Sequence, residues 1–465
     1  MTQRVAPILL PLLAVAVAGA AEWPCMVGPN GDYTSPETGL SDRFPDGGPA
    51  VVWRARVAPG YAGLAVAGGR VFTVSATAGT LSKDYPDARG QINRVSKQTT
   101  EIGITVYALD AVSGATAWTH AYTVAGVFPV TDWGRKSVEG PWANYFGPKA
   151  TPTVDGGRVY VYDHVGVLTA LRADTGEQIW RRDVRADHGG MPPRFGYAAP
   201  PLVAGRLVVV PVFSETACLI ALDKDSGEPA WTGGIIGGLG GTSTRWDGYS
   251  IPVLRTLGGE EQIVFFTGAG VQALRPADGA TLWSRAIKSH TGEIVAPPLT
   301  DGTDVIVASH YISGAQCLRP AGGAVTEVWK TFDLKPRFAN IAAAGDAVYG
   351  AHGSHYGAEF RCLNRADGAR RWTTEFRAAP EQQTEHAQVL AADGKLILLT
   401  GYGDLVLAKA DPEAYAELAR GRLDDGSAAC QWWTPPSLAD GRLYARSTAG
   451  HVVCVDMRAD STLAP

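Results

Sequence analysis

One eleven-residue phrase recurs along the chain and constrains its fold more than any other feature. The phrase is Ala-x-Asp-x-x-x-Gly-x-x-x-Trp, found at residues 108–118 and again at 221–231. Looser copies place a Gly four residues before Trp180, Trp283 and Trp372, and Trp329 closes a copy that is two residues longer. Self-similarity of this kind is typical of repeat architectures, in which each copy is one supersecondary unit.

A second phrase precedes each copy and supplies the rest of the unit. It consists of a short apolar run, a Gly turn and a β-branched run, and it is clearest at residues 152–160, 201–209, 298–306 and 436–444. Weaker copies begin near Leu64, Pro252, Ala342 and Val389, which gives eight units in all. Each unit contains four short apolar runs between Gly, Asp and Asn turns, a pattern that indicates antiparallel strands. The sequence therefore predicts an all-β, eight-bladed β-propeller of four-stranded antiparallel blades.

The two ends of the repeat complete one another. The last phrase, at residues 451–456, has no following Trp, whereas Trp53 has no preceding inner strands. We expect the N-terminal strand to pair with the C-terminal blade, which closes the ring and removes its free edges. The seventh unit departs from the pattern, because Tyr415 and Leu418 stand where Gly and Trp are expected.

These motifs resemble the PQQ-like β-propeller repeat family, which includes BamB-like assembly factors and the propellers of quinoprotein dehydrogenases. The resemblance is carried by the Ala-x-Asp-x-x-x-Gly-x-x-x-Trp phrase and spans nearly the whole mature chain. The segments 23–30 and 35–40 are similar to the leader of exported members. The resemblance implies the fold, and it implies either a scaffold or an enzyme, because this fold hosts both.

Composition and the N-terminus bear on location and on domain organisation. Residues 1–20 carry Arg4, an apolar run and a small-residue end, which predicts a secretory signal peptide; a membrane anchor is the alternative, for which the run is short. A leader follows at 21–50, and 51–465 form a single propeller domain. We expect a periplasmic or extracellular monomer with no transmembrane segment in the mature chain. The net charge of −5 and the lack of a basic run argue against nucleic acid as a partner.

The repeat residues themselves are expected to be structural. A Trp on each outer strand offers a flat face to the neighbouring blade and an indole N–H to a backbone acceptor. Asp110 and Asp223 are expected to accept from turn amides. Cys317, Cys362 and Cys454 occupy the slot of a small inward residue on the third strand, whereas a Cys25–Cys430 disulfide stays an open alternative. The structural anchors are Trp53, Trp118, Trp180, Trp231, Trp283, Trp329 and Trp372.

Departures from the repeat collect on one face. Long segments at 76–103, 122–149, 185–198 and 232–250 all connect strands at the same end of the blades, where binding residues of a rigid scaffold tend to lie. Aromatic and polar residues stand where these loops enter the innermost strands, so we expect them to ring one mouth of the central channel. The aromatic ones are Tyr61, Tyr145, Phe146, Phe195, Tyr197, Trp246, Tyr249, Phe338, Trp432 and Trp433. The polar ones are Lys149, Arg194, His290, Glu293, Arg337, Asn340 and His386.

Three functions compete for this mouth, besides the possibility that the aromatic residues merely fill the channel. The sequence favours a non-catalytic module that binds a protein, peptide or polysaccharide and holds no cofactor. The alternative is a dehydrogenase of alcohols or sugars that uses PQQ with Ca²⁺. For this enzyme Glu293 and Asn340 offer oxygen ligands, but adjacent cysteines and a haem motif are missing from the sequence. A hydrolase or lyase using His310, His352 and His355 is the third hypothesis.

Overall fold

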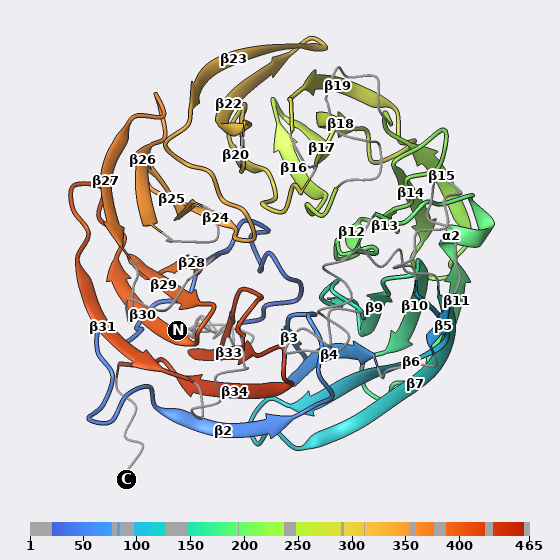
Figure 1. Ribbon diagram of the computed structural model, residues 1–465, viewed down its shortest axis with the longest axis horizontal. Helices are drawn as coiled ribbons and strands as arrows, with labels where there is room; N and C mark the ends of the chain where they lie inside the picture. Colours follow the sequence, from blue (N-terminus) through green and yellow to red (C-terminus); the bar gives the residue numbers. More distant parts are fainter. Residues whose placement is uncertain are drawn as a thin grey trace, which may run out of the picture.

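Eight four-stranded sheets are arranged as the blades of a closed ring (Figure 1). The structure is a computed structural model that describes residues 21–76, 81–83, 97–126, 147–193, 195–236, 248–289, 293–310, 312–353, 359–375, 387–423 and 431–459. Consecutive strands of each blade pair antiparallel, with the first strand nearest the central axis and the fourth on the outside. The eight-bladed propeller predicted from the repeat is confirmed.

The first four blades follow one another around the ring, with extra elements at two points. Blade 1 contains β3 (Ala65–Ala67), β4 (Arg70–Ala76), β6 (Lys97–Asp110) and β7 (Thr116–Gly126), and the short β5 (Leu81–Lys83) also pairs with β6. Blade 2 contains β8 (Thr153–Asp155), β9 (Arg158–Tyr162), β10 (Val167–Arg172) and β11 (Gln178–Asp183), followed by the helix α2 (Val184–Asp187). Blade 3 contains β12 (Leu202–Ala204), β13 (Leu207–Pro211), β14 (Leu219–Asp223) and β15 (Pro229–Gly233). Blade 4 contains β16 (Val253–Leu257), β17 (Glu260–Thr267), β18 (Gly270–Leu274) and β19 (Thr281–Ala286).

The remaining blades complete the ring and take up the N-terminal strands. Blade 5 contains β20 (Leu299–Asp301), β21 (Asp304–Ser309), β22 (Gly314–Ala321) and β23 (Ala324–Thr331). Blade 6 contains β24 (Ile341–Ala344), β25 (Ala347–His352), β26 (Glu359–Asn364) and β27 (Arg370–Glu375). Blade 7 contains β28 (Ala387–Ala392), β29 (Lys395–Thr400), β30 (Asp404–Lys409) and β31 (Glu417–Arg422), with β1 (Thr34–Ser35) added parallel to β28. Blade 8 contains β32 (Ser437–Ala439), β33 (Arg442–Arg446), β34 (His451–Asp456) and β2 (Val51–Arg56).

The ring closes as expected, because the N-terminal β2 is the outermost strand of the C-terminal blade. β2 pairs antiparallel with β34, and Trp53 lies opposite Cys454. The same pairing of a small residue with Trp recurs in the other blades, as Ala170 with Trp180 and Cys362 with Trp372. Blade 7 departs from the pattern as expected, but Ala419 and not Leu418 takes the Trp position, opposite Leu407.

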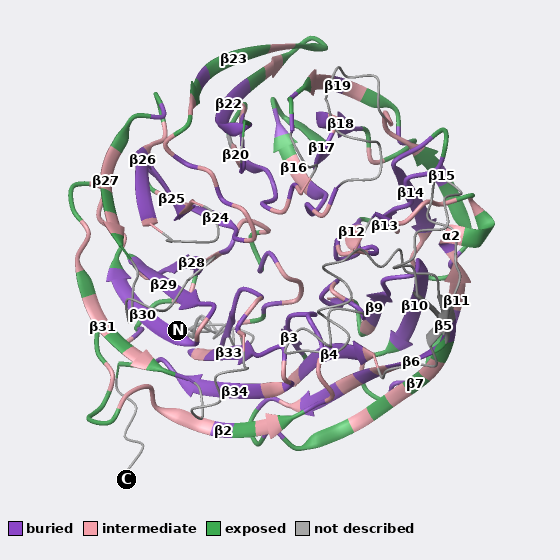
Figure 2. Ribbon diagram, viewed as in Figure 1, coloured by how far each residue is buried: buried purple, intermediate pink, exposed green. Residues whose placement is uncertain are grey.

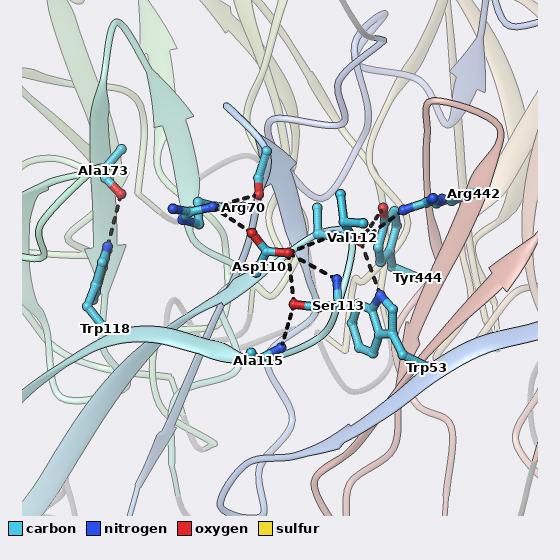
Figure 3. A network of polar contacts seen from close by, with 12 residues as sticks. Trp53, Arg70, Asp110, Val112, Ser113, Ala115, Trp118, Ala173, Arg442 and Tyr444 are labelled. Atoms are coloured by element: carbon cyan, nitrogen blue, oxygen red, sulfur yellow. Dashed lines mark hydrogen bonds and ion pairs between the residues drawn. The ribbon is translucent and has the colours of Figure 1, made fainter.

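Six of the seven outer Trp residues donate their indole N–H to a backbone carbonyl in a turn of the next blade. The indole N–H of Trp118 donates to Ala173 O at 3.0 Å, and that of Trp53 donates to Ala111 O at 3.1 Å (Figure 3). Tyr444 and Arg442 also donate to Ala111 O, at 3.2 and 3.4 Å, so three side chains of blade 8 converge on one carbonyl of blade 1. Equivalent bonds join Trp180, Trp231, Trp329 and Trp372 to Lys224, Pro276, Arg365 and Asp411.

The turn that receives the indole is shaped by its Asp and Gly. One oxygen of Asp110 accepts from the backbone N–H groups of Val112 and Ser113 at 3.1 and 3.0 Å, which holds the turn (Figure 3). Among the outer Trp residues, Trp283 is the exception. Its indole N–H donates to the Gln262 side chain of its own blade at 2.7 Å and not to the next blade. In blade 5 the hairpin of β22 and β23 continues to Gly322 and Gly323 in place of the docking phrase.

Burial follows the strand order, as Figure 2 shows: inner strands are buried and outer strands such as β23 and β27 are largely exposed or half-buried. Cys317, Cys362 and Cys454 are buried in the third strands, in the slot predicted for a small residue. They are free thiols, as are Cys218 and the half-buried Cys25. Cys430 lies outside the described residues.

The leader crosses the centre of the ring on the face of the short turns, which the sequence did not indicate (Figure 1). Trp23 exchanges two backbone hydrogen bonds with Val66 of blade 1, both at 2.8 Å. Further along, Tyr33 O accepts from Ala391 N of blade 7 at 2.9 Å. The side chains of Trp23 and Tyr33 are almost fully buried. The leader is therefore part of the core and covers one end of the channel.

A buried arginine joins the last blade to the first. Arg446 on β33 donates to Ala62 O and Val74 O at 2.9 Å each, to Ser75 Oγ at 2.7 Å, and also to Thr73 Oγ1 and Ala58 O. Its exposed fraction is 2%, and burial lowers the pKa of its guanidinium to about 10. The acceptors are all uncharged, so oxygen dipoles of blade 1 stabilise the charge.

Candidate functional site at the channel mouth

A cavity lies in the channel between the leader and the long-loop face, and every blade contributes to its lining. Its volume is about 90 Å³. Met26 and Tyr33 of the leader form its floor, and the innermost strands and the loops leading into them form its walls. The blades contribute Tyr61, Lys149, Phe195, Ala198, Tyr249, Ile251, Glu293, Val295, Phe338, Asn340, Gln388, Trp433 and Thr434.

The aromatic side chains form two contacting groups around the mouth. Trp433 packs edge-to-face with Tyr61 at a centroid distance of 5.6 Å and lies 5.2 Å from Phe338. Phe195 and Tyr249 form the second group, 5.8 Å apart, and Phe195 N–H donates to the Tyr249 hydroxyl at 3.2 Å. Aromatic rings held in this way present rigid apolar surface to a ligand with little loss of side-chain entropy.

Gln388 fixes the loops that carry two of these rings. Its amide donates to Phe338 O at 2.9 Å and to Trp433 O at 2.7 Å, and its oxygen accepts from Asn340 N at 3.2 Å. Gln388 is almost fully buried on β28. Sequence reasoning missed it, although a polar residue on an innermost strand is a usable signal for a side chain that faces the channel.

The charged side chains at the mouth are engaged locally. Arg337 forms an ion pair with Glu293 at 3.5 Å, and its guanidinium lies 4.7 Å from the centroid of the Phe338 ring. Both members of the ion pair are largely buried, with side-chain exposures of 10% and 15%. Removing one partner of such a pair leaves the other charge buried and uncompensated.

Lys149 contributes a cation whose charge is disfavoured. Its ammonium lies 6.0 Å from the centre of the Tyr61 ring and donates to Gly147 O at 3.4 Å. Burial lowers the pKa of Lys149 to about 7. Burial also lowers the pKa of the neighbouring His164, and the charge of Lys149 lowers it further. Burial therefore favours the neutral form of both basic side chains.

Eight of the residues expected at the mouth line the cavity, namely Tyr61, Lys149, Phe195, Tyr249, Glu293, Phe338, Asn340 and Trp433. Arg337 is tied to that lining by its ion pair with Glu293. Two others lie elsewhere. Tyr197 is buried between blades 2 and 3, where it donates to Val212 O at 2.7 Å and stacks on Phe213. Trp432 is buried and does not line the cavity, unlike its neighbour Trp433. Tyr145, Phe146, Arg194, Trp246, His290 and His386 lie outside the described residues.

The described residues at the mouth do not fit a calcium and PQQ site of the kind that the alternative function requires. Both polar atoms of the Asn340 amide are bonded to the backbone of Val389, at 2.6 and 2.9 Å, and Glu293 is paired with Arg337. In the part of the chain that the structure describes, no three His, Cys, Asp or Glu side chains are grouped closely enough to hold a metal. A cavity of about 90 Å³ is also smaller than the roughly 300–1,000 Å³ of ordinary ligand pockets.

The histidine hypothesis likewise finds no site in the described residues. Burial and the charge of Arg361 lower the pKa of His352 to about 4, which keeps this imidazole neutral. Nδ1 of His310 lies 3.3 Å from Lys335 O. His355 lies outside the described residues.

Eight blades, docking tryptophans and an aromatic channel mouth define a PQQ-like β-propeller. The family described as outer membrane protein assembly factor BamB matches residues 103–374, and the chain belongs to this family. No helix in the described ranges combines the length and the apolar character needed to cross a membrane.

Relatives of both functional kinds are found. The chain is 23% identical over 331 residues to the outer membrane protein assembly factor BamB of Moranella endobia, covering 65% of this chain and 79% of that protein. It is 24% identical over 273 residues to the quinoprotein alcohol dehydrogenase PedH of Pseudomonas putida, covering 53% of this chain but 42% of that protein. The crystal structure of BamB from Moraxella catarrhalis aligns with a TM-score of 0.55 at 17% identity, covering 88% of this chain and 99% of that one. That structural likeness concerns the fold alone.

Proposed function

We propose that the protein is an exported, non-catalytic binding or scaffolding module that works through its long-loop face. The observation that carries the proposal is the aromatic mouth, to which all eight blades contribute and which the leader closes from behind. A small cavity that the leader closes at one end and that aromatic rings line suits the capture of a side chain from a protein or peptide partner.

Three further points support this function. The chain belongs to a family named for outer membrane protein assembly, and a relative with that name aligns over 79% of its length. Asn340 and Glu293, the two residues that could offer oxygen ligands to a metal beside a quinone, are engaged in structural bonds. Export follows from the predicted signal peptide at 1–20, whose residues lie outside the described part of the chain.

Two measurements test the proposal. A photo-crosslinking amino acid placed at Phe338 or Trp433 in the cells that make the protein should give a discrete crosslinked product. The same group at Val112, on a short turn of the opposite face, should give none. Crosslinking that is equal at all three positions contradicts a role for the mouth.

The enzyme alternative is tested by thermal unfolding with and without PQQ and Ca²⁺. A ligand that binds only the native state raises the midpoint by mass action. We expect no shift at high excess. A saturable rise that is lost in Asn340→Ala and Glu293→Gln contradicts the proposal and favours the dehydrogenase.

A further inference from the structure

An exposed aromatic ring stands on the outer part of the long-loop face, away from the channel mouth. Phe332 follows the end of β23 and is 54% exposed, and Ile312, in the turn between β21 and β22, is 46% exposed. Among the exposed large hydrophobic side chains of the described ranges, Phe332 is the only aromatic one. Exposed aromatic residues of this kind are enriched where proteins bind one another.

The ring of Phe332 contacts a glycine and lies near two lysine side chains. It lies over Gly314, at which a Cβ atom would come within 3.1 Å of the ring. The ammonium groups of Lys330 and Lys335 lie 5.5 and 5.9 Å from the ring centre. The ring and the two cations therefore form one unit, in which each ammonium is attracted to the aromatic face.

Hydrogen bonds join this unit to its neighbouring loops. Ser313 Oγ donates to Lys288 O at 2.9 Å, which brings the exposed Lys288 to the same surface. On the other side, Nδ1 of His310 lies 3.3 Å from Lys335 O. We call the surface formed by Lys288, Ile312, Lys330, Phe332 and Lys335 the basic aromatic patch.

The patch carries a local positive charge on a protein of net charge −5. Asp333, which follows Phe332 in the sequence, is already paired with Arg370 at 2.9 Å and with Arg361 at 3.3 Å. No carboxylate of the described residues lies within ion-pair distance of Lys288, Lys330 or Lys335. By sequence, the adjoining segments 290–292 and 354–358 contain no acidic residue.

We propose that the basic aromatic patch binds an acidic segment of a partner protein in which carboxylates flank an apolar side chain. The carboxylates pair with the three lysines, and the apolar side chain covers Phe332 and Ile312. This inference rests on the proposed binding role and adds a second contact on the same face. An anionic membrane is a poorer match, because lipid-binding clusters carry roughly 4–8 basic residues and this protein is acidic overall.

Fluorescence anisotropy with two labelled peptides tests the proposal. In one peptide, aspartates and glutamates flank a single Phe; in the other, lysines replace the acidic residues. We expect the full-length protein to bind the acidic peptide, and Phe332→Ala to weaken binding about tenfold. Lys330→Glu with Lys335→Glu should weaken it by more at low salt and by less as salt rises.

Matched variants separate the outcomes. Val112→Ala, an exposed apolar side chain of the opposite face, should leave binding unchanged, and unfolding midpoints verify that the surface variants fold. If both peptides bind equally, or if Phe332→Ala binds the acidic peptide as tightly as the wild type does, the proposal for the basic aromatic patch is wrong. Binding of phosphatidylglycerol vesicles in place of the acidic peptide overturns it as well. If Trp433→Ala abolishes partner crosslinking while Phe332→Ala does not, the patch fails and the proposed function of the mouth stands.

Discussion

A Cβ atom at Gly176 would lie 2.5 Å from the indole ring of Trp118 in the preceding blade. Gly176 also has a positive φ of 76°, so the position combines a turn that favours glycine with a surface on which a ring rests. We expect Gly176→Ala to lower the free energy of unfolding by about 2–4 kcal/mol, from backbone strain and displacement of the indole together. Denaturant unfolding measures the change.

The chain offers a matched control for that substitution. Gly156, in another turn of the same blade, has a φ of 53°, and a Cβ atom added there would meet no other atom within 4 Å. Gly156→Ala should therefore cost about 1–2 kcal/mol, from strain alone. If the two variants lose the same free energy of unfolding, backbone strain in the turn explains both losses and the contact with the Trp118 indole adds nothing.

Arg446 provides a test of ring closure. Arg446→Met removes the hydrogen bonds to blade 1 and leaves their buried oxygens unsatisfied, so we expect a loss of about 3–5 kcal/mol. Arg442, on the same strand but half-buried and 3.4 Å from Ala111 O, serves as the control, and Arg442→Met should cost less. Guanidinium unfolding monitored by tryptophan fluorescence compares the two. If Arg446→Met leaves the free energy of unfolding unchanged, the pairing of β2 with β34 closes the ring without a contribution from Arg446.

The pH dependence of stability should report on Lys149. Its pKa is lowered to about 7 in the folded protein, against roughly 10.4 in an unfolded chain. Between these values the unfolded state binds more protons, so stability rises as pH increases from about 7 towards 10. Lys149→Met should flatten this rise and exceed the wild type at pH 6 by about 4 kcal/mol, because the shift exceeds three pKa units. If the unfolding midpoints of Lys149→Met depend on pH as those of the wild type do, a group other than Lys149 causes the pH dependence.

Thiol labelling tests the burial of the repeat cysteines. Burial raises the pKa of Cys218, Cys317, Cys362 and Cys454 to about 12, so almost no thiolate forms at pH 8. We expect iodoacetamide to leave all four unmodified in the native protein and to label them after denaturation, as read by peptide mass spectrometry. Rapid native labelling of any one would indicate local opening of its blade.

The sequence predicts the ring well because its signals are local. Each docking phrase carries both the turn that receives one indole and the Trp that reaches the next blade. The apolar phrase that precedes it recurs eight times, once in each blade. Ring closure was predictable for the same reason, since Trp53 and residues 451–456 each lack the half that the other supplies.

The mouth was predicted less completely, because side-chain direction is not fixed where strands end. Trp432 is buried, whereas the next residue, Trp433, lines the cavity. Neither lies in a strand, so strand periodicity could not predict which of the two side chains faces the channel. The floor of the cavity was missed because Met26 and Tyr33 belong to a leader without repeats, held by contacts distant in the sequence.

The pairing of β2 with β34 has a consequence for how the chain reaches its final state. The first strand of the ring must wait for the last one to be synthesised and delivered, and until then both expose unpaired backbone groups. Closing so long a loop is slow relative to forming a local hairpin, so the seven complete blades should assemble first. The open ring is then the species most exposed to edge-to-edge aggregation, and a chain that ends before residue 451 would stay in it.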